Sequence, residues 1–272
     1  MTDKEPLGTA LITGASSGIG AVYATKLAER GYDLILVARD RLKLEAVATH
    51  IAGSTGRSVR FLPSDLIECY DISCIEELLR SDPSVTMLVN NAGFGSTASI
   101  LDADIDRMQS LISLNVTALT RLTYAAVPQF VSRGHGTVIN ISSIVAIAPE
   151  ILNGVYGGTK AFVLAFTQSL HHELQGKGVR VQAVLPPGTR TQFFSVAGTP
   201  IEAMTEERRN RLMSPEDLVD AALSGLDQGE VITIPSLPDK AEWDAYEAAR
   251  QEMVPHLLRP NPADRYRSAH GS

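Results

Sequence analysis

The sequence predicts an α/β fold, a doubly wound parallel sheet of about seven strands with helices on both faces. Short runs that are apolar at every position alternate along the chain with longer segments of helical periodicity. Strands that are apolar on both faces belong to a sheet that is covered on both sides, and right-handed crossovers connect them. With 272 residues, 44% of them hydrophobic, the chain can bury one large core, so a single domain is expected.

The first half of the chain supplies four of the expected strands. Residues 34–38, LILVA, are apolar throughout, and the segment after them carries apolar residues at helical spacing. The same alternation recurs before and after this pair. It predicts strands at 9–12, 34–38, 59–62 and 87–89, and helices at 19–30, 39–55, 70–80 and about 104–132.

The second half repeats the pattern, with strands at 137–141, 179–185 and 231–234 and helices at about 155–175 and 215–226. Residues 1–235 are therefore expected to form the domain. Residues 236–272 are expected to be a C-terminal helical extension and tail, not a separate domain. This tail either packs on a neighbouring subunit or frays at the terminus.

Composition and charge exclude several classes of protein. The net charge of −7 and the scattered Lys and Arg residues argue against a nucleic-acid partner. No apolar stretch is long enough to span a bilayer, so we expect no membrane partner and a soluble, cytoplasmic protein. Cys69 and Cys74 stand five positions apart on an expected helix and point to different faces, which indicates neither a disulfide nor a metal site.

The glycine-rich segment 13–20, TGASSGIG, joins the first strand to the first helix. Gly14, Gly18 and Gly20 lack the Cβ atoms that would keep a diphosphate away from the backbone. The helix that begins near Gly18 directs its unpaired N–H groups and the positive end of its dipole at such an anion. The segment therefore predicts a cradle for the phosphates of a dinucleotide.

Two other interpretations of this segment remain open. Its spacing differs from G-x-G-x-x-G, and it also matches the G-x-S-x-G turn of hydrolases, with Ser16 as the nucleophile. Against a hydrolase, such a turn normally follows several strands, whereas this one lies near the N-terminus. A glycine turn without any ligand is the other alternative.

Tyr156 and Lys160 stand four positions apart on one face of an expected helix. A tyrosine titrates near about 10, and a neighbouring ammonium would lower that pKa so that the phenol could exchange a proton near neutral pH. Ser143, which directly follows the fifth strand, could hydrogen-bond the same substrate oxygen. The alternative is a surface helix with an extended lysine.

Taken together, these motifs resemble the short-chain dehydrogenase/reductase family, a family of Rossmann-type folds. The resemblance covers the chain from the first strand to about residue 234. The matching motifs are TGASSGIG at 13–20, NNAG at 90–93, Asn115, ISS at 141–143, and YGGTK at 156–160. The spacing of Ser143 and Tyr156 along the sequence also matches that of the family.

The resemblance implies a hydride transfer between a nicotinamide and a carbonyl or secondary alcohol. Tyr156 is then the acid or base, Ser143 orients the substrate oxygen, Lys160 binds the nicotinamide ribose, and Asn115 supports a water-linked proton path. Pro187 departs from the family, which usually has glycine there. The cofactor contacts that the resemblance implies are Gly14, Ser16, Ser17, Gly18, Ile19, Gly20, Asp65, Leu66, Asn91, Ala92, Gly93, Tyr156, Lys160, Thr189 and Thr191.

The end of the second strand indicates NADP(H). Sites for the unphosphorylated cofactor carry an acid there, whereas this chain has Ala38 followed by Arg39, whose guanidinium can pair with a 2′-phosphate. Asp40 is one position too far and is expected to cap the next helix.

We therefore predict an NADP(H)-dependent oxidoreductase acting on a small-molecule carbonyl or alcohol, and the family resemblance implies a homodimer or homotetramer. Alternatives are an epimerase or dehydratase of the same family, a serine hydrolase, and a non-catalytic NADP(H)-binding protein. Apolar residues of the loop 193–204 and of 147–152 indicate a partly apolar substrate, or else a subunit contact.

Overall fold

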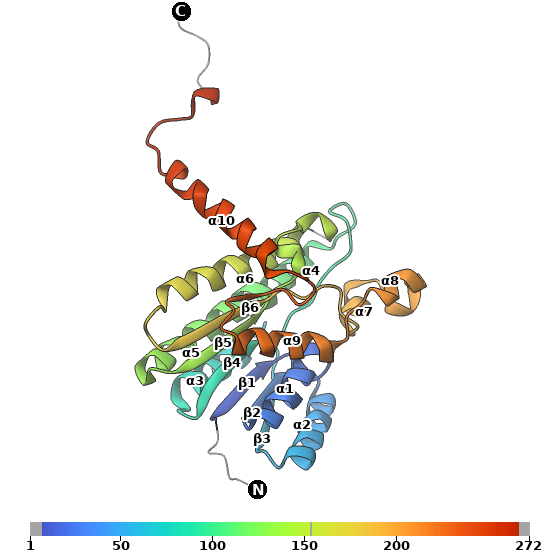
Figure 1. The fold of residues 1–272 in the computed structure, drawn as a ribbon. Coiled ribbons are helices and arrows are strands. Elements are labelled where there is room, and N and C mark those ends of the chain that lie inside the picture. The colour runs from blue at the N-terminus through green and yellow to red at the C-terminus, as the bar shows by residue number, and fades with distance from the viewer. Residues whose placement is uncertain (1–6, 153, 267–272) are drawn as a thin grey trace, which may run out of the picture. The chain divides into compact units, whose positions relative to one another are not determined.

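The computed structural model describes residues 7–152 and 154–266. Its described part contains one sheet of seven parallel strands in the order β3-β2-β1-β4-β5-β6-β7 (Figure 1). Every strand lies where the sequence predicts one, which confirms the doubly wound fold. The strands are β1 Thr9–Thr13, β2 Asp33–Ala38, β3 Val59–Pro63, β4 Val85–Asn90, β5 Gly136–Ile141, β6 Val179–Val184 and β7 Ile232–Thr233.

Helices cover both faces of the sheet because successive strand residues point to opposite sides. In β1, Ile12 belongs to the core under α1, α2 and α9, whereas Leu11 belongs to the core under α3, α5 and α6. The helices are α1 Gly18–Arg30, α2 Arg41–Thr55, α3 Cys69–Ser81, α4 Ile105–Ile112, α5 Leu119–Arg133, α6 Gly154–Glu173, α7 Phe193–Ala197, α8 Glu206–Asn210, α9 Pro215–Asp227 and α10 Lys240–Leu257.

The order of the strands reverses at β1. The chain runs outward from β1 to β2 and β3, and then returns to place β4 on the other side of β1. At such a reversal the connecting segments diverge and leave a crevice beyond the carboxyl ends of the strands. The segments that follow β1 and β4 therefore face each other across the position where a ligand binds in folds of this kind.

The long helix predicted at 104–132 is present and changes its winding in the middle. Helix α4 continues directly into a π-helical segment, Ser113–Ala118, and this segment continues into α5. A π-helical turn accommodates one extra residue and is frequent at functional sites. Here it contains Asn115, the residue that the family resemblance singled out.

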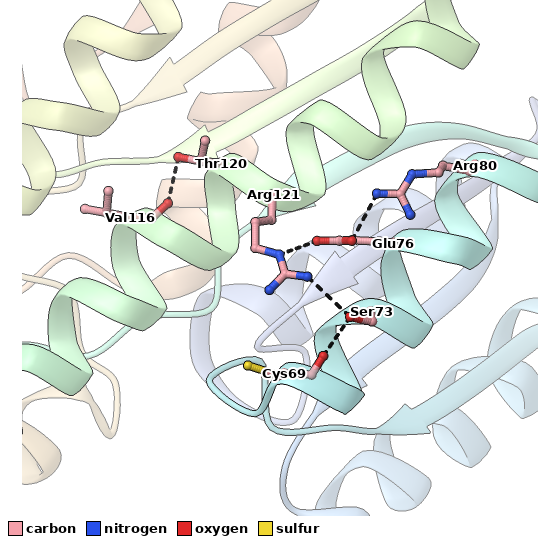
Figure 2. Close-up of polar contacts among 7 residues, drawn as sticks. All are labelled: Cys69, Ser73, Glu76, Arg80, Val116, Thr120 and Arg121. Atoms are coloured by element: carbon pink, nitrogen blue, oxygen red, sulfur yellow. Dashed lines mark hydrogen bonds and ion pairs between the residues drawn. The ribbon is translucent and has the colours of Figure 1, made fainter.

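An ion pair joins α3 to α5 (Figure 2). Glu76 is 7% exposed, and its carboxylate accepts from the guanidinium of Arg121 on α5 and, at 3.0 Å, from Arg80 one helical turn away. Arg121 also donates to the hydroxyl of Ser73 at 3.3 Å. Because both guanidinium groups remain partly exposed, the pair links the two helices at the edge of the core.

The described residues divide into two compact units with the border between Pro235 and Ser236. The first holds the sheet. The second contains α10, on which the rings of Trp243 and Tyr246 lie 5.2 Å apart. Within the described ranges, no helix combines the length and the apolar character that crossing a membrane requires.

Candidate active site

The glycine turn connects β1 to α1 as predicted. Gly14 and Gly18 have φ values of 67° and 55°, which residues with a side chain rarely adopt. A Cβ on Gly14 would lie 2.9 Å from Cα of Ala92, so a side chain there would collide with the segment after β4. Ser17 precedes the helix and makes no capping bond through its side chain, so the first N–H groups of α1 remain directed at the crevice.

Thr13 and Asn91 hold this turn against the end of β4. The Thr13 hydroxyl accepts from the amides of Asn91 and Ala92, both at 3.0 Å. In return, the Asn91 side chain donates to the carbonyl oxygens of Thr13 at 2.9 Å and Gly14 at 3.2 Å. Thr13 was not predicted to hold the turn, although its place at the end of the first strand is the signal that indicates such a role.

Gly20 does not line the crevice, in contrast to the other residues of the turn that were predicted to bind the cofactor. A Cβ at this position would lie 2.3 Å from the carbonyl oxygen of Gly14 and 2.5 Å from Nδ2 of Asn91. The absence of a side chain at Gly20 therefore allows α1 to approach the turn closely. The structure thus gives Gly20 a packing role behind the cavity lining, and its direct contact with the cofactor stays a prediction.

One cavity of about 890 Å³ lies along the carboxyl ends of the strands. Arg39 and Lys43 lie at one part of its lining and Tyr156 and Lys160 at another, with the glycine turn among its walls. These residues fit a dinucleotide, because glycines admit the phosphates to the backbone, a helix N-terminus faces them, and basic groups are available for a further phosphate. The predicted residues that line it are Gly14, Ser16, Ser17, Gly18, Ile19, Arg39, Asp65, Leu66, Asn91, Ala92, Gly93, Ser143, Tyr156, Lys160, Thr189 and Thr191.

Arg39 follows β2 and is 69% exposed along its side chain, with Nη1 3.7 Å from Oδ2 of Asp65. This weak surface pair leaves most donors of the guanidinium directed at solvent and the cavity. Asp40 caps α2, as predicted, by accepting from the amide of Lys43 at 3.1 Å. The acid that would compete with a phosphate is therefore engaged by the helix.

Ser143, Tyr156 and Lys160 converge from β5 and α6. Tyr156 is 6% exposed and shares a side-chain hydrogen bond with Ser143. Lys160, also 6% exposed, donates from Nζ to the carbonyl oxygen of Ile141 at 2.9 Å. The neighbouring Ser142, which we did not predict, donates to the carbonyl oxygen of Lys160 at 2.8 Å and joins α6 to the end of β5.

The pKa of Tyr156 differs in direction from our expectation. Burial raises it well above its usual value near 10, although the hydrogen bond from Ser143 acts in the opposite direction. Burial also lowers the pKa of Lys160 to about 8. The expected effect of the ammonium on the phenol is smaller than the cost of keeping either charge in this water-poor environment.

Asn115 lies behind the cavity wall, and it was predicted among the catalytic residues. Its side chain is 1% exposed, donates to the carbonyl oxygen of Phe94 at 2.9 Å and to the hydroxyl of Thr159 at 3.2 Å, and accepts from the amide of Phe94 at 3.1 Å. A Cβ on Gly93 would lie 2.8 Å from its Oδ1. Asn115 thus connects the loop after β4 to the helix that carries Tyr156.

The segment after β6 closes the cavity over the glycine turn. Thr191 lies close enough to Gly18 that a Cβ there would be 3.1 Å from its Cγ2. Thr189 is 5% exposed and donates to the carbonyl oxygen of Pro187 at 2.9 Å, so this turn is ordered by its own side chain despite the second proline.

Apolar and aromatic residues line the part of the cavity next to Tyr156. Phe94, in the segment after β4, belongs to this wall. Elsewhere the cavity lining includes residues that were not predicted, because they come from segments far apart in the chain: Leu114, Arg208, Arg211 and Leu212. Among the residues that the structure describes, no group of three or more His, Cys, Asp or Glu side chains could hold a metal ion.

A doubly wound parallel sheet with this crevice and this glycine turn defines a Rossmann-type α/β protein. A family profile described as short chain dehydrogenase matches residues 8–200. The chain belongs to the short-chain dehydrogenase/reductase family.

Solved structures and curated relatives agree with this assignment. A short-chain dehydrogenase from Sphingobium yanoikuyae in complex with NADPH is 45% identical, with a TM-score of 0.91 over 96% of this chain and 100% of that one. The bulky-bulky ketone specific alcohol dehydrogenase from Comamonas testosteroni is 40% identical, with a TM-score of 0.86 over 96% and 98%. Human 17-beta-hydroxysteroid dehydrogenase type 3 is 36% identical over 201 residues, or 73% of this chain, which spans 64% of that enzyme.

Proposed function

We propose that this chain is an NADP(H)-dependent oxidoreductase that interconverts a ketone and a secondary alcohol. The observation that carries the proposal is that Ser143, Tyr156 and Lys160 line the same cavity as the glycine turn. The family and the names of its similar members, which are dehydrogenases and reductases, support it further. When bound, the nicotinamide would supply or accept the hydride.

Tyr156 would hold the proton that passes to or from the substrate oxygen. Because burial raises its pKa, the phenol stays protonated at neutral pH and can donate to a carbonyl oxygen during reduction. Ser143, which already shares a hydrogen bond with this phenol, would hold the same oxygen in reach. Lys160 is fixed beside them by the Ile141 carbonyl and would bind the nicotinamide ribose.

Arg39 would select NADP(H) over NAD(H). Its guanidinium lines the cavity at the end of β2, where Ala38 stands in place of an acid, and the dehydrogenase from Sphingobium yanoikuyae was solved with NADPH. Gly14, Ser16, Ser17, Gly18, Ile19, Asp65, Leu66, Asn91, Ala92, Gly93, Thr189 and Thr191 would complete the cofactor site.

The substrate would be partly apolar. Phe94, Leu152, Phe193 and Phe194 line the cavity near Tyr156, and the similar Comamonas enzyme is named for its action on bulky ketones. A serine hydrolase based on Ser16 finds no support, since the described lining contains no histidine to act as its base.

We also propose the assembly and location of the protein. Stacked rings of Tyr124, Phe162 and Phe166 on α5 and α6 support a homodimer or homotetramer built on these helices, since Tyr124 is 70% exposed. Two free, exposed cysteines, Cys69 and Cys74, suit the reducing cytoplasm. Residues 1–235 would form the catalytic domain, and residues 236–272 an extension of it.

The decisive experiment follows NADPH absorbance while the protein is mixed with a series of ketones and, in the reverse direction, NADP⁺ with secondary alcohols. We expect ketone-dependent oxidation of NADPH, with NADH slower at the same concentration. NADPH binding without turnover on any ketone or alcohol would contradict the proposal.

A further inference from the structure

Gly95 lies in the loop after β4 and is buried against the aromatic wall of the cavity. An ideal Cβ at this position would lie 2.3 Å from Cζ of Phe193 and 3.0 Å from one of its Cε atoms. Gly95 is absent from the glycines with positive φ, so its backbone conformation is open to any residue. The position therefore requires glycine because of the Phe193 ring and not because of the backbone.

The Phe193 ring has little freedom to move away from an added methyl group. Its centre lies 5.5 Å from that of Tyr156, with the planes tilted by 49°, and 5.7 Å from that of Phe194, at 86°. Interiors are packed closely, and a ring displaced from one neighbour meets another. The neighbour on one side is the proposed proton donor.

Helix α7, which carries Phe193, is fastened to the same loop that contains Gly95. Thr97 donates to the carbonyl oxygen of Ala197 from its amide at 3.1 Å and from its hydroxyl at 3.0 Å. Arg107 of α4 donates to the carbonyl oxygen of Val196 at 2.5 Å and lies over the Phe94 ring at 5.1 Å. These bonds oppose an outward shift of α7, so an added side chain would displace the ring instead.

We propose that Gly95 is a specificity-determining residue. By leaving space for the Phe193 ring, it keeps the cavity beside the Tyr156 hydroxyl open to a ketone with a bulky apolar substituent. This inference rests on the proposed ketone reduction. Gly95 is not among the residues that line the cavity and acts through Phe193, as a positioning residue.

The test compares Gly95→Ala, Phe193→Ala and the double variant with the parent. The readout is the ratio of kcat/KM for benzophenone to that for acetone, at fixed NADPH. Gly95→Ala should lower this ratio about tenfold or more, since one methylene in an apolar pocket typically changes discrimination by about 10- to 200-fold. The double variant should behave like Phe193→Ala alone, because the added methyl group then has no ring to displace.

Thermal unfolding provides a readout that needs no substrate. Gly95→Ala should lower Tm by about 2 to 10 °C through overpacking, and Phe193→Ala should remove this extra loss. If Gly95→Ala does not fold, recovery of a folded double variant supports the inference, and its failure to recover overturns it. The matched control is Gly53→Ala on α2, where an added Cβ meets nothing within 4 Å and should change neither the ratio nor the cavity.

Two negative outcomes are distinguishable. A parent that turns over no ketone or secondary alcohol of the series overturns the proposed function and this inference with it. An active parent whose ratio and Tm are unchanged by Gly95→Ala overturns only the inference, as does a loss that Phe193→Ala does not relieve.

Discussion

Nζ of Lys160 lies 5.8 Å from the centre of the Tyr156 ring. Both side chains are buried, and burial disfavours the charged form of each, so the phenol keeps its proton and the ammonium loses its proton more readily than it would in water. The pair is therefore poised as an acid next to a weakened cation, and not as a phenolate held by a full charge.

Tyr156→Phe should abolish most of the turnover while NADPH still binds. The substitution removes the transferable proton and keeps the ring that packs against Phe193. Positioned acids and bases are typically worth about 10²- to 10⁴-fold, and we expect a loss of kcat in that range. The measurement is ketone-dependent NADPH oxidation with cofactor fluorescence as a binding check. Tyr70→Phe, 80% exposed on α3, is the matched control, and near-parental turnover of the Tyr156 variant would refute the assigned role.

Lys160→Met should remove a pH dependence of stability. The folded-state pKa of Lys160 is about 8 against 10.5 for the free group, so the unfolded chain binds more protons between these values. The free energy of unfolding of the parent should therefore rise from pH 8 to pH 10, by up to about 3 kcal/mol over the full shift.

The measurement is urea unfolding at several pH values in this window. Above about 10 the raised pKa values of Tyr156 and Tyr23 act in the opposite direction, because the unfolded tyrosines lose protons first. Lys177→Met, at an exposed position, should keep the parental slope. A slope that survives in Lys160→Met would show that another group causes it.

Arg39→Ala should weaken NADPH binding and leave NADH nearly unchanged. Hydrogen bonds to a charged group are worth about 1.5 to 3 kcal/mol, or roughly 10- to 150-fold in affinity. Because Arg39 is largely exposed and lies near Asp65, we expect the lower part of this range. The readout is the ratio of kcat/KM for the two cofactors at fixed ionic strength, with Arg41→Ala as the control. An unmoved ratio would assign the phosphate to another group, such as Lys43.

Glu76→Gln should destabilise the contact between α3 and α5 by about 1 to 3 kcal/mol, since it replaces charge-assisted hydrogen bonds in a partly buried site. The hydrogen bond from Arg121 is the main cause that lowers the pKa of Glu76, with Arg80 adding to it and burial opposing it. Its contribution is therefore present above the unfolded pKa and lost as pH falls below about 4.5.

Chemical unfolding of Glu76→Gln between pH 3 and 7 measures both effects. The difference from the parent should be largest near neutral pH and should shrink in acid. Glu77→Gln, on the exposed side of the same helix, should differ little from the parent at any pH. A pH-independent difference would indicate a packing role for Glu76 instead.

The order of the elements and the position of the crevice were accessible from the sequence because they depend on local patterns. An apolar run such as that of β2 reports burial on both faces, and a turn such as 13–20 requires glycine for its own backbone angles. Residues directly after parallel strands share one edge of the sheet, so Asn91 and Ser143 were placed near the glycine turn without coordinates.

Contacts between distant segments were decided only by the tertiary structure. Gly95 lies in the loop after β4 and Phe193 begins α7 after β6, and nothing in either segment indicates that one lacks a Cβ because of the ring of the other. The direction in which the pKa of Tyr156 shifts was likewise decided only by the tertiary structure. The sequence places Lys160 on the same helical face and so predicts a lowered value. Desolvation, however, depends on every segment that covers the site, and those segments include the loops after β4 and β5 and helix α7.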